Sequence, residues 1–328
     1  MKIRLGTIGS GPIVHTILDF VKMTEGIDLV AVYSRTEEKA CSLAKKYGAD
    51  RTYTDMAAFL QDEEMNFVYV ASPNLLHYEQ TKKALLAGKH VICEKPFCTK
   101  VSEARELVGL AKSKGLFLID AVPTTFTPNF AILKRELPKI GKVKLVMGNY
   151  SQYSSRYDAV LKGEVPNIFN PAYGGGCMMD INFYNLYLNI ALFGKPIEAK
   201  YYANKFGDLA DTSGILMMQY DGFVSSSMGA KDTWGVNFFQ IEGEKGFIYI
   251  KDGSNGIVEV RVVTKNSDET FDENGDMERR FYEVQEIARL VQEEDYKSIY
   301  SRLDIMLEVI ETLEKVRKEA GLIFPGDE

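Results

Sequence analysis

Short apolar runs and amphipathic stretches alternate strictly over the first third of the chain. Apolar runs occupy residues 3–9, 29–33, 67–71, 90–93 and 116–120, and helical periodicity occupies residues 13–24, 37–47, 78–87 and 102–113. Glycines at 48, 88 and 115 end three of the expected helices, and Ser102 is the expected N-cap of the last. Because strand and helix in turn require crossover connections, the alternation predicts a doubly wound parallel α/β domain over residues 1–122.

The pattern changes after residue 122. Segments 142–153, 215–220, 224–228, 238–242 and 247–251 alternate apolar with polar residues, and Asp221-Gly222 and Asp252-Gly253 are hairpin turn signals. One helix is expected over 178–193, and two more near 282–293 and 300–318. Residues 123–328 are therefore predicted to form an α+β domain with a sizeable, mainly antiparallel sheet.

Composition excludes several classes of function. The 328 residues carry 39 Lys and Arg against 46 Asp and Glu, and a net charge of −7 disfavours a nucleic-acid partner. No window approaches the roughly 20 apolar residues that span a bilayer, and glycines interrupt the first apolar run, unlike a signal peptide. The four scattered cysteines and three histidines lack the spacing of a metal site. We expect a cytoplasmic protein with no bound metal.

The segment Gly9-Ser10-Gly11 follows the first expected strand and precedes the first expected helix. In that context the first glycine permits a tight turn, and the second permits close approach of the backbone to a pyrophosphate held by the helix N-terminus. We therefore expect Gly9, Gly11, Pro12 and Ile13 to bind a dinucleotide. Val14 occupies the third position of the fingerprint, where glycine or alanine is usual.

The acidic residue that binds the ribose hydroxyls of NAD is missing after the second expected strand. The chain has Ser34-Arg35 there, and a hydroxyl beside a guanidinium suits a 2′-phosphate. This predicts NADP as the preferred cofactor over NAD. The alternative interpretation is an ordinary solvated arginine at the start of a helix.

Two further segments follow expected strands at the carboxyl edge of the sheet, where such folds bind ligands. Ser72, Pro73, Asn74 and His77 belong to the first, and Glu94-Lys95-Pro96 belongs to the second; we expect these residues, up to Lys95, to contact the cofactor. A lysine beside an oxidised nicotinamide is desolvated and faces a like charge, and both lower its pKa toward a range useful for proton transfer. A strand-end lysine taken alone is more often simply solvated.

Asp180 and Tyr184 are four residues apart and share one face of the expected helix. Taken alone, they fit an acid that complements the helix dipole and a packed tyrosine.

Together these motifs resemble the Gfo/Idh/MocA family of NAD(P)-dependent oxidoreductases. The resemblance rests on the GxG turn, SPNxLH, AGKHVxxEKP, GGGxxxDxxxY and the closing Leu192-Phe193-Gly194. It implies that Lys95 binds substrate and assists proton transfer, and that the Lys95–Pro96 peptide is cis. It also implies that Tyr184 exchanges a proton with the substrate oxygen, that Asp180 orients a hydroxyl or the lysine, and that the second domain is open-faced and often mediates oligomers.

The chain departs from the family in places. Thr125-Phe126-Thr127-Pro128 lacks the arginine and histidine that relatives carry, and Asn182 stands where glycine is frequent. Tyr153, Arg156 and Asn167 are candidates for substrate contacts, although tyrosine–serine alternation is also typical of an exposed strand face.

The predicted function is an NADP(H)-preferring oxidoreductase that acts on a secondary alcohol or ketone of a sugar, polyol or dihydrodiol, as a homodimer or homotetramer. An alternative is a glycosidase or lyase that uses tightly bound NAD in a transient redox cycle. A nucleotide-sensing regulator is a third interpretation, but such a protein would be expected to lose Lys95, Asp180 or Tyr184.

Overall fold

The computed structural model describes residues 1–327, which form two compact units. Unit 1 comprises Met1–Val122 and Arg280–Leu307, and unit 2 comprises Pro123–Arg279 and the segment that begins at Glu308. Over the described residues, no helix combines the length and the apolar character needed to cross a membrane.

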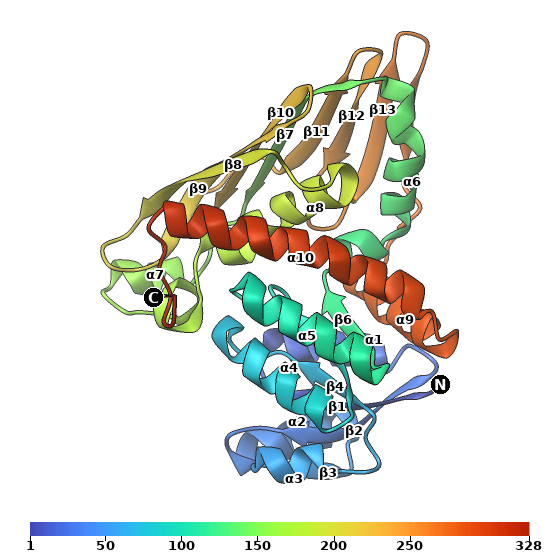
Figure 1. The fold of residues 1–328 in the computed structure, drawn as a ribbon, viewed down its shortest axis with the longest axis vertical. Coiled ribbons are helices and arrows are strands. Elements are labelled where there is room, and N and C mark those ends of the chain that lie inside the picture. The colour runs from blue at the N-terminus through green and yellow to red at the C-terminus, as the bar shows by residue number, and fades with distance from the viewer. Residues whose placement is uncertain (328) are drawn as a thin grey trace. The chain divides into compact units, whose positions relative to one another are not determined.

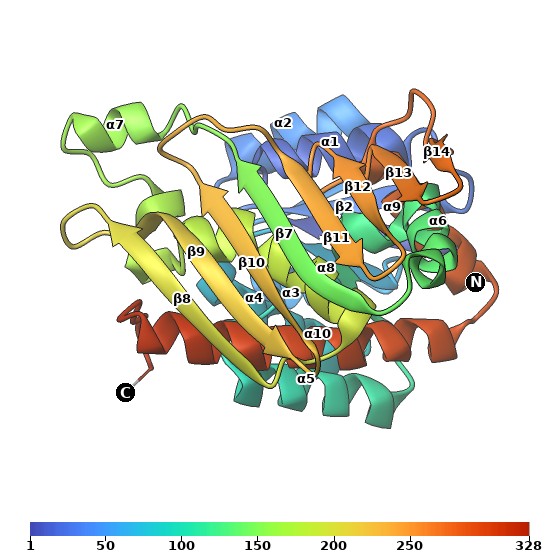
Figure 2. The same ribbon diagram turned by 90° about the horizontal axis from the view of Figure 1, so that it is seen from above.

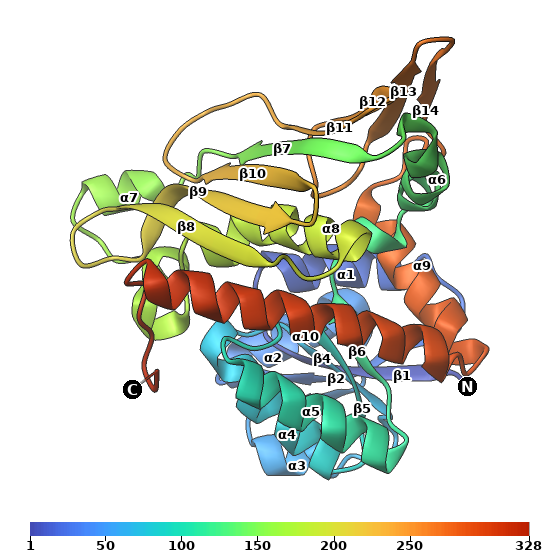
Figure 3. The same ribbon diagram turned by 45° about the horizontal axis from the view of Figure 1, so that its top comes forward.

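Unit 1 contains a six-stranded parallel sheet with the strand order β3-β2-β1-β4-β5-β6. Its strands are β1 (Ile3–Ile8), β2 (Ile27–Tyr33), β3 (Arg51–Tyr53), β4 (Phe67–Val70), β5 (His90–Glu94) and β6 (Leu118–Ala121). The first helices are α1 (Pro12–Val21), α2 (Glu37–Tyr47), α3 (Met56–Leu60), α4 (His77–Leu86) and α5 (Val101–Lys114) (Figure 1). Helices α4 and α5 lie side by side (Figure 3). The predicted doubly wound parallel fold is confirmed.

Glycines mark the C-terminal ends of two helices in unit 1. Gly48 and Gly115 adopt left-handed conformations, with φ of 81° and 62°, directly after α2 and α5, where glycine avoids the penalty that a side chain incurs. The expected N-cap of α5 was wrong, because the helix begins at Val101 with Lys100 as its cap. The short elements β3 and α3 were missed, since three and five residues are too few to show a period.

The division of the chain differs from the expected one in the C-terminal part. The sequence pattern predicts that residues 280–307 belong to the second domain, whereas in the structure they pack with unit 1. They include most of α9 (Arg279–Gln292) and the first half of α10 (Tyr296–Glu319). Tyr296 stacks on Phe117 with ring centroids 4.0 Å apart, and Arg302 pairs with the buried Asp120 at 3.3 Å. These contacts join sequence positions about 180 residues apart, which no local pattern reveals.

Unit 2 is built on an eight-stranded sheet with the order β14-β13-β12-β11-β7-β10-β9-β8. Its strands are β7 (Val143–Ser151), β8 (Glu198–Lys205), β9 (Asp211–Tyr220), β10 (Phe223–Ala230), β11 (Phe238–Gly243), β12 (Gly246–Lys251), β13 (Glu259–Thr264) and β14 (Asp268–Phe271). Neighbouring strands are antiparallel except β7 and β10, which are parallel. The predicted mainly antiparallel sheet is confirmed, although β8, β13 and β14 were not anticipated.

One face of this sheet forms the core of unit 2, and the other face is open. Helices α6 (Pro128–Glu136) and α8 (Phe183–Phe193) pack on the inner face, where Val146, Phe239 and Ile250 are buried. Figure 2 views the opposite face, on which no helix within residues 1–327 of this unit packs. Along β9 the burial alternates, so Ile215 and Met217 point outward and are exposed. The sheet is open-faced, as the resemblance implied.

Candidate active site

The expected cofactor residues of unit 1 all follow the carboxyl ends of its strands. Gly9 and Gly11 follow β1, Ser34 and Arg35 follow β2, and the Ser72–Asn74 segment follows β4. The strand order reverses its direction between β1 and β4, and open parallel sheets bind ligands at the carboxyl edge beside such a switch point.

Steric requirements at the first turn match those of a dinucleotide site. Gly9 has a φ of +120°, and a Cβ there would lie 2.6 Å from the carbonyl oxygen of Ala71, so the two loops touch. Gly11, in contrast, has nothing within 4 Å of a Cβ position. It is the N-cap of α1 and supplies no side-chain hydrogen bond, Pro12 opens the helix, and no acidic residue stands in the first turn. An uncapped, positively polarised helix end beside open space fits a pyrophosphate.

The segment after β2 presents a cation where NAD-binding folds present an acid. Ser34 is buried, and its backbone N–H donates to the carbonyl oxygen of Tyr53 at 3.1 Å. Arg35 is exposed, and no carboxylate among residues 1–327 pairs with it. The guanidinium is therefore available to an anionic ligand at this edge.

His77 connects the loops after β4 and β5. The ring is buried, with Nδ1 2.9 Å from the carbonyl oxygen of Pro96 and Nε2 2.7 Å from that of Ser72. Burial lowers the pKa of His77, and a neutral ring donates only one of these two hydrogen bonds. A direct contact between His77 and the cofactor stays a prediction; the ring nitrogens themselves face the backbone.

Glu94, the residue before Lys95, belongs to a buried charged network. It accepts hydrogen bonds from the Tyr69 hydroxyl at 2.8 Å and from Arg280 at 3.2 Å, and Arg280 also donates to Glu283 at 2.6 Å. The Lys95–Pro96 peptide is cis, as the resemblance implied. The hydrogen bonds of Glu94 fix the residue before Lys95, and the half-buried lysine directly follows β5 at the ligand edge.

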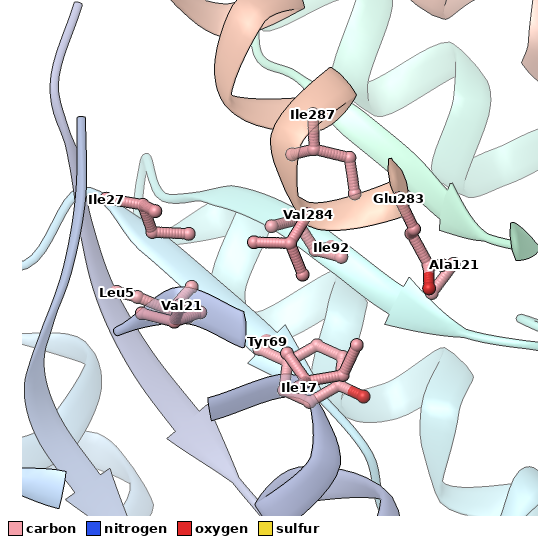
Figure 4. Close-up of a pocket in the computed structure, with 10 residues that line it drawn as sticks. All are labelled: Leu5, Ile17, Val21, Ile27, Tyr69, Ile92, Ala121, Glu283, Val284 and Ile287. Atoms are coloured by element: carbon pink, nitrogen blue, oxygen red, sulfur yellow. The ribbon is translucent and has the colours of Figure 1, made fainter. Parts of the chain in front are cut away.

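A small cavity of about 20 Å³ lies beside this network, enough for about one water molecule. Figure 4 shows it lined by side chains of α1, α9 and the sheet, namely Leu5, Ile17, Val21, Ile27, Tyr69, Ile92, Ala121, Glu283, Val284 and Ile287. Burial raises the pKa of the Glu283 carboxyl, and the charge of Glu94 adds to the rise, whereas the Arg280 guanidinium opposes it. The walls are otherwise apolar, so this cavity does not extend the cofactor site.

In unit 2 the glycine run creates the start of the segment that carries Asp180. A Cβ on Gly175 would lie 2.6 Å from the carbonyl oxygen of Ile168, and one on Gly176 would lie 2.2 Å from Oδ1 of Asp211. Asp211 in turn accepts the backbone N–H of Met178 at 2.7 Å. Met178–Asn182 is one turn of π-helix, which leads directly into α8. Side chains at these glycines would displace the turn, so the spacing of the motif has a steric reason.

Asp180 pairs with a lysine that the sequence analysis missed. The ammonium group of Lys231, just beyond the end of β10, contacts Oδ2 of Asp180. The Lys231 side chain is 5% exposed and that of Asp180 is 29% exposed. The two residues are 51 positions apart, so no local signal links them.

Tyr184 lies in the first turn of α8 and is buried. Its ring packs edge-on against Tyr150 with centroids 5.9 Å apart, and the Tyr150 hydroxyl accepts from Asn255 at 2.6 Å. Asn182, at the position where glycine was expected, is fully buried and donates to the backbone oxygen of Ser227 on β10 at 3.1 Å. The asparagine thus ties the π-turn to the sheet, and the structure holds Asp180 and Tyr184 on one continuous, anchored segment.

The three candidate substrate contacts of unit 2 lie in the loops after β7. Tyr153 donates to Asp158 at 2.6 Å and stacks on the exposed Trp234, with centroids 5.3 Å apart. Arg156 precedes the short helix α7 (Tyr157–Leu161), and Asn167 opens a 3₁₀ turn; both are exposed. Trp234 was not singled out from the sequence. The substrate roles of Tyr153, Arg156 and Asn167 stay predictions.

Comparison with known proteins now decides the family. Residues 3–120 match the family described as oxidoreductase family, NAD-binding Rossmann fold, and residues 137–249 match the GFO/IDH/MocA C-terminal domain. This chain belongs to the Gfo/Idh/MocA family. It is accordingly an NAD(P)-dependent oxidoreductase with a Rossmann cofactor domain.

Curated relatives cover the whole chain. This Gfo/Idh/MocA protein is 35% identical to scyllo-inositol 2-dehydrogenase (NADP(+)) IolU of Bacillus subtilis, over 99% of each chain. It is 26% identical to trans-1,2-dihydrobenzene-1,2-diol dehydrogenase of Sus scrofa, over 100% of this chain and 99% of the relative.

Among solved structures, the 3-ketoreductase KijD10 of Actinomadura kijaniata, in complex with NADP and TDP-benzene, is similar with a TM-score of 0.85 and 20% identity. The match covers 97% of this chain and 98% of that one. At that identity the likeness supports the fold alone.

Proposed function

We propose that this oxidoreductase prefers NADP(H) and interconverts a secondary alcohol and a ketone on a sugar, a polyol or a dihydrodiol. The observation that carries the proposal is Lys95, which directly follows β5 at the carboxyl edge of the sheet and the buried Glu94. Relatives named as inositol, dihydrodiol and xylose dehydrogenases support the substrate class.

Each candidate residue has a distinct task in this proposal. Bound NADP(H) supplies or accepts the hydride at the substrate carbon. During oxidation the phenolate form of Tyr184 accepts the hydroxyl proton of the substrate, and during reduction its neutral phenol donates a proton to the substrate oxygen. The Lys95 ammonium binds the substrate and favours negative charge on the oxygen that gives up the proton. Asp180 accepts a hydrogen bond from a hydroxyl of the substrate and fixes its orientation.

Preference for NADP rests on Ser34 and Arg35. The exposed guanidinium has no carboxylate partner among the described residues, and a forked cation binds a phosphate in a bidentate manner.

A second feature concerns assembly: the open sheet face exposes Tyr202, Ile215, Met217 and Val224. We propose that a second copy covers this apolar face in a homo-oligomer.

The test is NADP⁺ reduction, followed by absorbance, over a panel of inositols, aldoses, anhydrosugars and dihydrodiols with NAD⁺ in parallel. The proposal predicts turnover of one class, faster with NADP⁺. No turnover across the panel, with a nicotinamide cofactor retained through purification, would contradict it and favour a glycosidase or lyase with a transient redox cycle. Turnover with NAD⁺ at the same or a higher rate would overturn the cofactor preference alone.

A further inference from the structure

We propose that Lys231 is a positioning residue that holds the Asp180 carboxylate for substrate binding, an inference that rests on the proposed dehydrogenase function. The geometry behind it lies wholly in unit 2. Lys231 makes a direct ion pair with Asp180 and belongs to no motif of the sequence analysis.

The backbone of Lys231 is fixed from two sides. Its N–H donates to the carbonyl oxygen of Thr212 on β9 at 2.8 Å, and its own carbonyl accepts the N–H of Ser154, beyond β7, at 2.9 Å. The ammonium also lies 5.9 Å from the centroid of the Phe169 ring. Lys231 is therefore held where three segments converge, which restricts the position of its side chain.

Exposure of the two charged groups is unequal, and this asymmetry points to function. The lysine is almost fully enclosed, whereas 29% of the Asp180 side chain remains accessible. Removing an ammonium from water is unfavourable unless it is paired. Here the buried Lys231 ammonium is paired with Asp180, whose carboxylate remains partly accessible to a ligand.

Other acidic groups near Lys231 have partners of their own. Asp211 accepts from the Tyr201 hydroxyl at 2.6 Å and from the Met178 backbone at 2.7 Å. Asp232 accepts from Ser213 at 3.1 Å. Burial raises the pKa of the nearby Cys177 thiol, which keeps it uncharged. The carboxylate that the ammonium contacts is Asp180.

A carboxylate fixed in this way can accept a hydrogen bond from a substrate hydroxyl without first losing rotational freedom. Loss of the lysine frees Asp180 to turn away, and misplacement by about 1 Å lowers rates by about 100-fold. We therefore expect Lys231→Met to lower kcat/KM by about 100-fold. Binding of NADP⁺ by unit 1 should not change.

The experiment is a double-mutant cycle on the substrate found by the panel, with Lys231→Met, Asp180→Asn and the double variant. If Lys231 acts through Asp180, the double variant loses no more kcat/KM than Asp180→Asn alone, and both single variants change kcat and KM in the same proportion. Lys231→Arg, which keeps the charge, should recover about tenfold of the loss. Lys195→Met is the matched control, because it breaks an exposed ion pair of the same unit with Glu311 and should leave kcat/KM unchanged.

Several outcomes would overturn the inference. Losses that multiply in the double variant would show that Lys231 acts independently of Asp180, and an equal loss in Lys195→Met would show an unspecific effect. If Lys231→Met does not fold, Lys231→Gln takes its place in the cycle; if neither folds, the lysine is structural and the inference is wrong. A wild-type enzyme that turns over no panel member refutes the dehydrogenase proposal before any variant is made, and this inference fails with it.

Discussion

Replacing Asp211 by asparagine should change how the stability of unit 2 depends on pH. Burial raises the pKa of this carboxyl from 3.8 to about 6, despite hydrogen bonds from Tyr201 and Met178. The folded state therefore holds the proton more tightly than the unfolded state. Folding stability from this group is fully present below pH 4 and is lost as the pH rises through about 6.

The magnitude follows from the shift. A rise of about two pKa units, at about 1.4 kcal/mol each, amounts to about 3 kcal/mol between pH 4 and pH 7. Asparagine keeps one oxygen to accept both hydrogen bonds and cannot ionise. Relative to wild type, Asp211→Asn should therefore become more stable by about 3 kcal/mol over this pH range.

The assay is urea unfolding at several pH values, followed by far-UV circular dichroism, because Trp234, the only tryptophan of the chain, is exposed in the folded state. Asp268→Asn is the control, because the pKa of this exposed carboxyl is lowered by Arg261 and its pH dependence has the opposite sign. A stability difference between wild type and Asp211→Asn that is flat, or that falls from pH 4 to pH 7, would refute the reasoning.

Three further predictions concern other parts of the molecule. In a fluorescence titration, Arg35→Ala should raise the Kd of NADP⁺ by about 10- to 100-fold and leave that of NAD⁺ unchanged. The substitution removes a charge-assisted contact worth about 1.5–3 kcal/mol. Equal effects on both cofactors would contradict this prediction. Gly176→Ala should destabilise the protein by at least about 3 kcal/mol, because its φ is +131° and its Cβ would lie 2.2 Å from Asp211. The control Gly207→Ala, at positive φ in open space, should lose only about 1–2 kcal/mol in the same unfolding assay. Trp234 is 79% exposed, so its emission should resemble that of free tryptophan and be quenched by acrylamide; protection from acrylamide would show that another copy or segment covers it in solution.

Sequence patterns predicted the features that depend on local physics. Alternation of strand and helix, with Gly48 and Gly115 at helix ends, predicted the parallel sheet. Each strand and helix could be recognised because its pattern involves only residues that are neighbours in the sequence. The GxG turn and the EKP segment were located at strand ends for the same reason.

Features that depend on long-range contacts were not predicted. The return of residues 280–307 to unit 1 depends on partners such as Phe117 and Asp120, far away in sequence. The lysine that pairs with Asp180 follows an ordinary strand, and nothing nearby in the sequence distinguishes it from a solvated residue. The π-turn before α8 depends on the Asp211 side chain of another element, so a regular helix was expected there.

The central claim is that Lys95 carries the substrate chemistry of an NADP(H)-dependent dehydrogenase. The most direct measurement compares the initial rate of NADP⁺ reduction by wild type and by Lys95→Met on the substrate found by the panel, with the Kd of NADP⁺ measured for both. The account predicts that kcat falls by at least about 100-fold while the variant still folds and binds NADP⁺. A Lys95→Met variant that folds, binds NADP⁺ and keeps the wild-type kcat would contradict it.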